Sequence, residues 1–219
     1  MQENNKRIIF CDFDGTITTQ DSLVHILDEF ADKNWREIEL RVKKGEIGNR
    51  ISLKEEFDSF RGSWDDITEC IDKNISIDPH LKQFLKFCDN TSTDFIILSG
   101  GFQSIIKYIL EKNSIQNITY YANILKIIEN KATLTYPYPS DRCKICGHCK
   151  TSHLLKARDN GYKTIVYIGD GTTDRCPIKE ADIVFAKGSL ARYCEKSSIK
   201  FISWDTFLDI QSILEKIFV

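Results

Sequence analysis

Long hydrophobic runs are missing from this sequence, and no apolar stretch approaches the ~20 residues that a helix needs to cross a bilayer. Neither sign of charge is in excess, since 30 Lys and Arg oppose 32 Asp and Glu for a formal net charge of −2. Internal repeats and low-complexity segments are also lacking. We therefore expect neither a membrane-spanning protein nor one whose partner is a nucleic acid or an anionic membrane.

An export signal is the next feature that we do not find. Residues 1–7 are polar and lead directly into the first apolar run, so we expect no signal peptide. The eight cysteines are scattered through a chain of 219 residues, which is long enough for a substantial hydrophobic core. Reduced thiols in a cytoplasmic protein are the interpretation that this distribution favours.

The most informative stretch is an apolar run at residues 8–11 that ends in two acids. An unbroken run of this kind is typical of a strand buried on both faces of a parallel sheet. Asp12 and Asp14 follow at alternate positions, directly before Gly15 and Thr16. Ligands gather beyond the carboxyl ends of such strands, and two acids there need a cation or hydrogen-bond donors to offset their burial. This indicates metal or phosphate chemistry; the structural alternative is an Asx turn that closes an ordinary strand.

The pattern becomes helical between residues 17 and 77. Apolar residues at helical spacing predict helices over residues 22–31, 35–44, 51–60 and 64–73, the last with Ser63 as a possible N-cap. No segment of this region is a convincing strand. Asp78 and Pro79 then predict the N-cap and first position of a further helix.

Strands and helices alternate through the rest of the chain, which indicates the α/β class. The sequence predicts strands at 94–98, 118–126, 132–136, 164–168, 182–186 and 200–202. It predicts helices at 103–112, 151–159 and 206–218.

Two more predicted strands end in reactive side chains. Ser99 ends one, and Asp170 and Asp174 follow another. Lys150 begins a helix, where a cation is disfavoured by the helix dipole unless an anion is also bound there. Carboxylates suit Mg²⁺, and a hydroxyl, a lysine and glycine-flanked amides suit a phosphoryl group. Taken singly, Ser99 could be a helix cap, Asp174 a first-turn acid and Lys150 a surface lysine.

In order and spacing, these four motifs resemble those of the haloacid dehalogenase superfamily. Asp12 to Thr16 matches its first motif, Ser99 its second, Lys150 its third, and Gly169 to Asp174 its fourth. The interval from Asp12 to Ser99 is far longer than one crossover needs, so the insertion is in the first position, as in the phosphoserine phosphatase-like branch. Asp21 and the cysteines before Lys150 give a narrower resemblance to the methionine-salvage phosphatases, which act on 2-hydroxy-3-keto-5-methylthiopentenyl-1-phosphate.

This resemblance implies a Rossmann-like, doubly wound parallel sheet with a small α-helical cap inserted after the first strand. Residues 1–16 and 78–219 would form the catalytic core and residues 17–77 the cap. The implied activity is Mg²⁺-dependent hydrolysis of a small phosphorylated metabolite through an aspartyl-phosphate. Aspartate at position 14 favours a phosphatase or phosphomutase, because dehalogenases lack this acid and ion-pumping ATPases carry threonine there.

The resemblance also implies a role for each matching residue. Asp12 is the nucleophile, and Asp14 protonates the leaving alcohol and later deprotonates the water. Three groups hold the metal: the Asp12 carboxylate, the Asp14 backbone carbonyl and Asp170. Asp174 completes or orients that shell. The residues implied to bind or support the phosphoryl group are Thr16, Ser99, Gly100 and Lys150.

The substrate is less readable than the reaction. Asp21 falls where the phosphoserine enzymes carry a longer glutamate that meets the substrate's amino group. Arg50 and Arg61 are candidates for a substrate anion, although arginines on a helical cap are usually solvated. Phosphoserine and phosphocholine or phosphoethanolamine remain alternative substrates. Hydrolysis against phosphoryl transfer, and the oligomeric state, also stay open.

Three cysteines at regular spacing invite a zinc assignment. Cys143, Cys146 and Cys149 form one tight cluster, whereas a structural zinc site needs four ligands, usually from two pairs. His153 could supply the fourth ligand. The interpretation that we favour is a loop of reduced thiols without stoichiometric zinc.

Two functions from other classes compete with an enzyme. A phospho-accepting receiver domain also uses a strand-end aspartate with magnesium, but receivers lack a helical insertion after the first strand. A non-catalytic binding protein on a decayed hydrolase fold is the second alternative. The motif positions are all filled here, which argues against decay.

Overall fold

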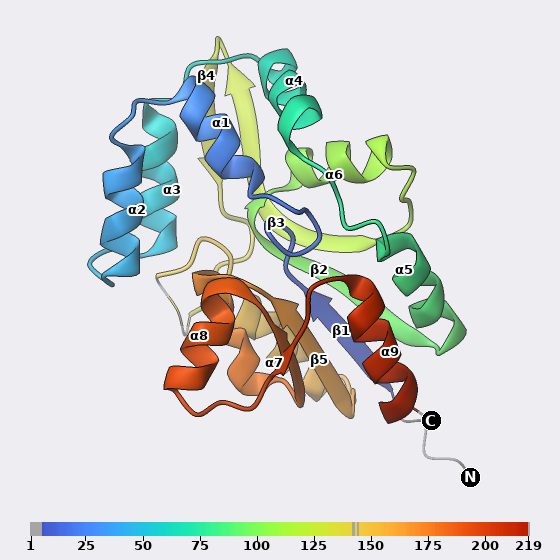
Figure 1. Ribbon diagram of the computed structural model, residues 1–219. Helices are drawn as coiled ribbons and strands as arrows, with labels where there is room; N and C mark the ends of the chain where they lie inside the picture. Colours follow the sequence, from blue (N-terminus) through green and yellow to red (C-terminus); the bar gives the residue numbers. More distant parts are fainter. Residues whose placement is uncertain (1–5, 142, 144, 219) are drawn as a thin grey trace.

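The computed structural model describes residues 6–141, 143 and 145–218, and its centre is a seven-stranded sheet (Figure 1). The strand order is β4-β3-β2-β1-β5-β6-β7, and neighbouring strands are parallel except for the antiparallel pair β3 and β4. The fold class expected from the sequence is therefore confirmed. The strands are β1 (Arg7–Cys11), β2 (Thr93–Phe102), β3 (Thr119–Ile128), β4 (Lys131–Thr135), β5 (Thr164–Gly169), β6 (Ile183–Ala186) and β7 (Ile202–Ser203).

Strand β1 is central because its side chains are apolar on both faces of the sheet. Ile9 and Cys11 belong to the hydrophobic cluster on one face, and Ile8 and Phe10 to the cluster on the other. The first face is covered by α5 (Leu81–Asn90), α6 (Gln103–Lys112) and α9 (Phe207–Ile217), and the second by α7 (Lys150–Asp159) and α8 (Gly188–Lys196). Two covered faces explain why these strands show continuous apolar runs rather than alternation.

Four helices lie between β1 and α5 in the chain and pack above the carboxyl ends of the strands (Figure 1). They are α1 (Ser22–Phe30), α2 (Trp35–Lys43), α3 (Asn49–Asp58) and α4 (Trp64–Asn74). Asp21 caps α1 and Ser63 caps α4, the latter with a full capping box. The two ends of this insertion run side by side, because Thr18 and Ile77 form an antiparallel bridge.

The β3–β4 hairpin reaches up to the same helices. Its turn residues Glu129 and Asn130 both have positive φ, which a two-residue hairpin turn requires. The carbonyl of Asn130 accepts from the Gly62 amide at 3.2 Å, and the Tyr136 hydroxyl donates to the carbonyl of Arg50 at 3.1 Å. The helical insertion is therefore attached to the rest of the chain at the hairpin as well as at its own two ends.

Two sequence-based expectations differ from the structure. Asp78 is not the N-cap of α5, which begins at Leu81 after His80; its carboxylate instead accepts from the amides of His80 and Phe207. Helix α8 was not predicted, and it begins at Gly188, whose φ is positive. Its apolar residues, Leu190 and Cys194, lie four apart but are too few to stand out as a periodic pattern.

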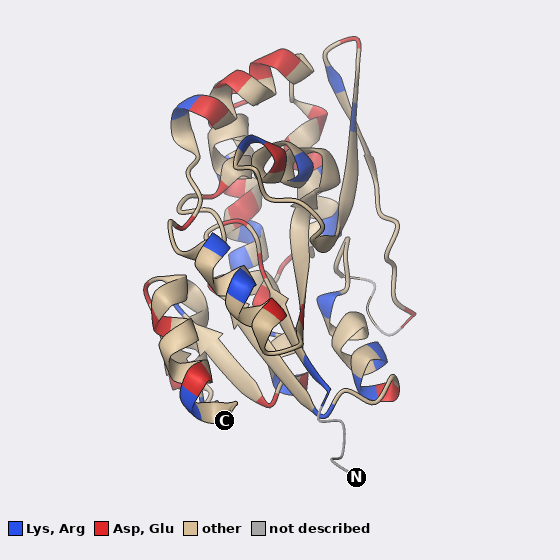
Figure 2. Cartoon of the chain, turned by 90° about the vertical axis from the view of Figure 1, so that its right-hand side faces the viewer, with Lys and Arg blue, Asp and Glu red and all other residues tan. Residues whose placement is uncertain are grey.

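Charged side chains of both signs are distributed over the helices (Figure 2). Helix α4, near the top of that view, is mainly acidic, whereas α3 carries the i,i+4 ion pair of Lys54 with Asp58. Across the residues that the structure describes, we find no helix with the length and apolar character needed to cross a membrane.

Candidate active site

Asp12 lies directly beyond β1 and continues its ladder, because its amide donates to the carbonyl of Ile168 at 2.9 Å. The residue is 6% exposed. Its Oδ1 accepts from the Phe13 amide at 2.8 Å and pairs with Lys150 Nζ at 2.7 Å. Burial, and then the nearby Asp174 carboxylate, raise the pKa of Asp12 well above its ordinary value. The negative charge of the aspartates around Asp12 is therefore only partly neutralised by Lys150.

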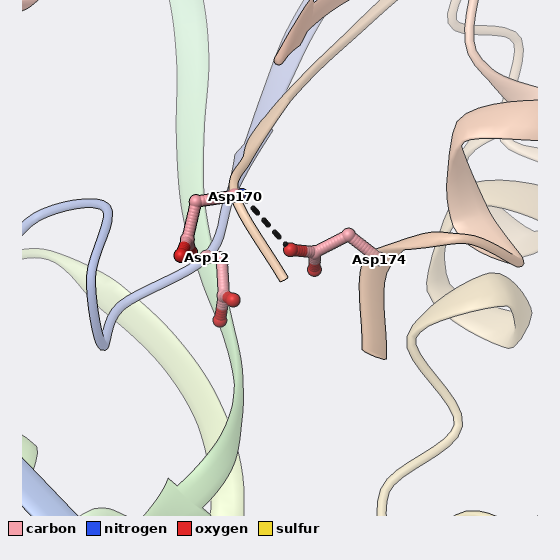
Figure 3. A group of neighbouring side chains, drawn as sticks. All are labelled: Asp12, Asp170 and Asp174. Atoms are coloured by element: carbon pink, nitrogen blue, oxygen red, sulfur yellow. Dashed lines mark hydrogen bonds between the residues drawn. The ribbon is translucent and has the colours of Figure 1, made fainter. Parts of the chain in front are cut away.

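The acids that follow β5 face Asp12 across the strand ends (Figure 3). Ligand oxygens of Asp12, Asp170 and Asp174 all lie within 4.8 Å of one another. Thr16 Oγ1 donates to Asp170 Oδ1 at 2.9 Å, and burial raises the pKa of Asp170 to about 6. Gly15 makes this approach possible: its φ is +73°, and a Cβ there would lie 2.7 Å from Asp170 Oδ2.

Asp174 is the best-satisfied acid of the group. Its Oδ1 accepts from Lys150 Nζ at 2.8 Å and from the Tyr167 hydroxyl at 2.6 Å. Its Oδ2 accepts from the amides of Asp170 and Gly171. Burial alone would raise its pKa, but the Lys150 charge and these donors lower the pKa below its ordinary value. The fully bonded carboxylate is placed to orient its neighbours.

Lys150 begins α7 and is 3% exposed. Burial alone would lower the pKa of its ammonium, but Asp12 and Asp174 more than compensate, so the pKa is raised and the group stays charged. The surface-lysine interpretation is therefore wrong for this residue. Lys150 joins the acid after β1 to the acid after β5.

Asp14 lies apart from the three clustered acids, beside the start of α1. Its Oδ1 accepts from both the amide and the hydroxyl of Ser22. Burial, and then Asp21, raise the pKa of Asp14 to about 7 despite these bonds. At neutral pH this carboxyl therefore exists in both protonation states, which suits a group that must give and take a proton.

Ser99 lies on β2 three residues before its end, where the pairing with β3 is interrupted, and it is 1% exposed. Its Oγ accepts from the Gly101 amide at 2.8 Å. Gly101 in turn lies close to Asp14, since a Cβ on it would meet Asp14 Oδ2 at 3.0 Å. Residues from the ends of β1, β2 and β5 and from the start of α7 thus meet at one edge of the sheet, as the sequence predicted.

A cavity of about 410 Å³ lies between this edge and the helical insertion. Its floor includes Asp12, Asp14, Ser99 and Asp170. Its wall carries apolar side chains from α1, α2 and α3 together with three acids, and the wall residues are Asp21, Leu23, Val24, Leu27, Trp35, Glu39, Val42, Lys43, Asn49, Ser52, Leu53 and Glu56. The dimensions suit a small metabolite.

Arg50 and Arg61 do not line this cavity. Arg50 is exposed and lies over the ring of Tyr136, 5.1 Å from its centroid. Arg61 is also exposed and donates to the backbone carbonyls of Asp58 and Phe60. Both match the solvated interpretation better than the substrate-binding one. Asp21 does line the cavity, while its Oδ1 caps α1 through the amides of Leu23 and Val24.

The thiols of the candidate zinc group approach one another, since Cys143 interacts with both Cys146 and Cys149, but they do not complete a group of converging ligands. Among the described residues, the three aspartates are the group whose ligand atoms converge, and Cys143, Cys146, Cys149 and His153 do not form a second one. His153 is instead hydrogen-bonded to His148, with 2.8 Å between their Nε2 atoms. The structure therefore offers no support for a zinc site at this loop.

Several residues at the site were not singled out from the sequence. Tyr167 is on β5 two residues before its end, and a buried tyrosine in an apolar strand was the available signal. Ser22 follows the capping Asp21 and reads as part of the cap. Arg192 and Ser189, which line the cavity from α8, were missed because that helix was missed.

The site combines clustered aspartates and a serine from parallel strands, a buried lysine at the start of α7, and a helical insertion above them. This arrangement is that of a phosphatase of the haloacid dehalogenase type. The chain matches the model of a family described as putative phosphatase over residues 7–215, and it belongs to this family. It is 31% identical over 210 residues to the 2-hydroxy-3-keto-5-methylthiopentenyl-1-phosphate phosphatase of Bacillus cereus, which covers 94% of this chain and 95% of that protein.

Two further comparisons agree with this family. The chain is 33% identical to the bifunctional enzyme MtnB/MtnX of Bacillus licheniformis over 96% of its own length, and it spans half of that protein. A solved structure described as a phospho-aspartyl intermediate analogue of phosphoserine phosphatase has a TM-score of 0.71. That structure is 20% identical and covers 97% of this chain and 99% of its own, which shows the shared fold.

Proposed function

We propose that this protein is a Mg²⁺-dependent phosphatase that hydrolyses a small phosphomonoester through a phosphorylated Asp12. The observation that carries the proposal is the convergence of Asp12, Asp170 and Asp174 beside a buried, charged Lys150. The donors are all hard oxygens, and burial with neighbouring carboxylates raises the pKa of Asp12 and Asp170, so a cation would stabilise their charged forms. These residues therefore fit Mg²⁺. The ion would be held by Asp12, Asp170 and the Asp14 carbonyl.

The protein's own groups divide the reaction between them. Asp12 attacks phosphorus, and the bond to the alcohol oxygen breaks as the phosphoryl group passes to the carboxylate. Asp14, whose carboxyl is partly protonated near pH 7, gives its proton to the departing alcohol. The resulting Asp14 carboxylate then takes a proton from the water that attacks the phosphorylated Asp12. When bound, Mg²⁺ supplies positive charge beside the transferring phosphoryl oxygens.

Two groups hold the phosphoryl oxygens in this scheme. The Ser99 hydroxyl lies at the floor of the cavity, and the Lys150 ammonium is fixed within 2.8 Å of both Asp12 and Asp174. Because Asp174 is fully bonded, we assign it to orienting Lys150 and the Asp170–Gly171 backbone. Thr16 holds Asp170 in place. We further propose that residues 17–77 act as a cap over a core formed by residues 1–16 and 78–219.

Metal dependence is the test of this function. We expect p-nitrophenyl phosphate to be hydrolysed in Mg²⁺ and the rate to fall at least about 100-fold after EDTA treatment, because several kcal/mol of charge stabilisation are lost. Readdition of Mg²⁺ should restore the rate. A receiver domain or a binding protein would show no sustained turnover under either condition. Full turnover in EDTA would contradict the proposal.

The substrate favoured by similarity is a hydroxy-keto-methylthiopentenyl phosphate, as in the Bacillus cereus relative. The apolar wall, with Leu27, Trp35 and Leu53, suits a thioether tail. A specific observation favours a second candidate, a phosphate ester with a cationic head such as phosphocholine or phosphoethanolamine. This observation is that Glu56 is a buried carboxyl on the cavity wall with a raised pKa.

Glu56 is a buried carboxyl on the cavity wall. It is 6% exposed, and among the described residues no donor is hydrogen-bonded to its side chain. Burial, and then Glu39 and Asp21, raise its pKa to about 7. A carboxyl of this kind gains a partner when a cation enters the cavity.

Replacing Glu56 by glutamine separates the two substrate classes. For phosphocholine we expect KM to rise roughly 10- to 100-fold, the value of a charge-assisted contact of about 1.5–3 kcal/mol. For 3,3-dimethylbutyl phosphate, the uncharged isostere, we expect no change. In the parent enzyme the preference for phosphocholine over the isostere should grow as pH rises through about 7, because Glu56 becomes charged. Equal effects on both esters would exclude the cationic substrate.

The same variant has a stability signature. Since the folded-state pKa of Glu56 is raised from 4.5 to about 7, the parent loses folding free energy progressively as pH rises between these values. Glutamine does not ionise and so avoids this loss of folding free energy, which the rise in the Glu56 pKa limits to about 3 kcal/mol. The Tm of Glu56→Gln should therefore exceed that of the parent at pH 8 and approach it near pH 4.5. This result would show that any change in KM is not caused by misfolding.

A further inference from the structure

Strand β2 leaves its ladder just where it enters the site. Leu98 is paired with Tyr121 of β3, and the next pairing is Phe102 with Asn123, so residues 99–101 lie in an irregular segment between them. Ser99 is 1% exposed there. Buried carbonyls outside a ladder need other hydrogen-bond donors. Two side chains from elsewhere in the chain supply them.

The first of these side chains is His148, two residues before Lys150. Its Nδ1 lies 2.8 Å from the carbonyl oxygen of Ser99, and because a carbonyl only accepts, Nδ1 carries the hydrogen. Its Nε2 then accepts from Nε2–H of His153 at 2.8 Å. Burial lowers the pKa of His148 to about 3 and that of His153 to about 4, so both rings stay neutral and the tautomers are fixed.

The second is Asn123 on β3. Its Nδ2 donates to the carbonyl of Gly100 at 2.7 Å, and the residue is completely buried. Its Oδ1 has no hydrogen-bond partner among the described residues, which is a cost to folding. The cysteine loop reaches this point through Gly147, where a Cβ would lie 2.6 Å from Tyr136 and 3.4 Å from Asn123 Nδ2. Asn123 thus keeps its Nδ2 bond to Gly100 although its Oδ1 is left without a partner among the described residues. Because the unpartnered oxygen costs stability, we infer that the bond to Gly100 has a role besides stability.

We propose that His148 and Asn123 are positioning residues for phosphoryl binding. In a planar trans peptide the N–H points opposite to the C=O. Fixing the carbonyl of Ser99 on His148 therefore directs the Gly100 amide away from His148, and Gly100 lines the cavity. Fixing the carbonyl of Gly100 on Asn123 directs the Gly101 amide, which is bonded to Ser99 Oγ at 2.8 Å.

The contacts made by His148 and Asn123 thus hold the Ser99 hydroxyl and the Gly100 amide in position to bind the phosphoryl oxygens. Preorganised donors of this kind stabilise charge that develops in the transition state. The inference rests on the proposed phosphatase function and adds residues that lie behind the substrate-contacting surface. The loop that carries the cysteines also gains a role, because it brings His148 to Ser99.

Two replacements of His148 keep one half of its hydrogen bonding each. Asparagine places an N–H near the position of Nδ1 and keeps the bond to Ser99, whereas glutamine places its Oε1 near the position of Nε2, where it can accept from His153 Nε2–H. We expect His148→Gln to lose roughly 10- to 100-fold in kcat/KM, a part of the ~10²–10³ that a missing oxyanion donor costs. Its affinity for orthovanadate should fall by the same factor. His148→Asn should recover most of both quantities, and His80→Gln is the matched control outside the site.

Asn123→Leu keeps the test decisive if His148 variants fold poorly. Leucine removes the unpartnered Oδ1 but leaves the Gly100 carbonyl without its donor, so the two effects on stability offset each other, and we expect a Tm close to that of the parent with a roughly tenfold or greater loss of vanadate affinity. Unchanged vanadate affinity in both His148→Gln and Asn123→Leu would overturn the proposal, as would losses in proportion to Tm. A parent protein without Mg²⁺-dependent turnover would instead contradict the phosphatase function itself.

Discussion

An Asp12→Asn variant is expected to lose turnover by roughly 10⁵-fold or more, the order found when a covalent catalyst loses its nucleophile. The amide cannot attack phosphorus, so no acid-stable phosphoenzyme should form from labelled substrate. The parent, quenched in acid during turnover, should carry label on Asp12. Rapid-quench labelling and steady-state rates with p-nitrophenyl phosphate measure both effects.

The fold should survive this substitution. Burial raises the pKa of Asp12, so a neutral side chain of the same shape removes an unfavourable charge. Lys150 keeps Asp174 as its partner at 2.8 Å. We therefore expect the Tm of Asp12→Asn to equal or exceed that of the parent. Asp65→Asn, which changes an exposed aspartate, is the control and should keep parental activity. Incorporation of phosphate into Asp12→Asn would show that another residue is the nucleophile.

Asp14→Asn is expected to stop the reaction halfway when the leaving group is good. An aryl phosphate hardly needs the proton of Asp14, so the first step continues, whereas hydrolysis of the phosphorylated Asp12 slows by ~10²–10⁴-fold without its base. Stopped-flow measurement should show a burst of phenol close to one equivalent per active site. An alkyl phosphate, which needs the acid, should give neither burst nor appreciable turnover.

Ser22 provides the matched control for this experiment. It donates its amide and hydroxyl to Asp14 Oδ1, so Ser22→Ala removes one donor and leaves the carboxyl present. We expect this variant to turn over both esters, with a raised Asp14 pKa that shifts the pH profile upward, since donors to the carboxylate hold the pKa down. Parental turnover of alkyl phosphates by Asp14→Asn would reject the two roles assigned to Asp14.

The floor of the site could be predicted from the sequence because it depends on local signals. Parallel strands with both faces buried are continuous apolar runs, and their carboxyl ends meet at one edge of the sheet, so Asp12, Ser99 and Asp170 had to meet. Lys150 was placed by the resemblance and by its position at a helix start. The structure brings these residues together as expected.

The remainder of the site depends on contacts between residues far apart in the chain. His148 meets Ser99, and Tyr167 meets Asp174, through side chains whose directions no local pattern specifies. Glu56 reads as one of several charges on a helix until the insertion packs over the core and buries it. Asp78 misled for a related reason: its carboxylate serves a partner 129 residues away as well as its own turn.

The double attachment of the helical insertion has a mechanical consequence. A cap attached by one pair of linkers would open by rotating about them, and here the two linkers are held together by the bridge of Thr18 with Ile77. The helical insertion is also hydrogen-bonded to the β3–β4 hairpin and the residue that follows it, through Gly62 to Asn130 and through Arg50 to Tyr136. If residues 17–77 open as the proposed cap, the β3–β4 hairpin must bend with them or release them, and the contact of Asp72 with Lys112 must also give way. These attachments would then limit how often substrate enters and product leaves. A restraint that strengthens the attachment of the hairpin turn to Gly62 would therefore lower the turnover rate without contacting a catalytic group.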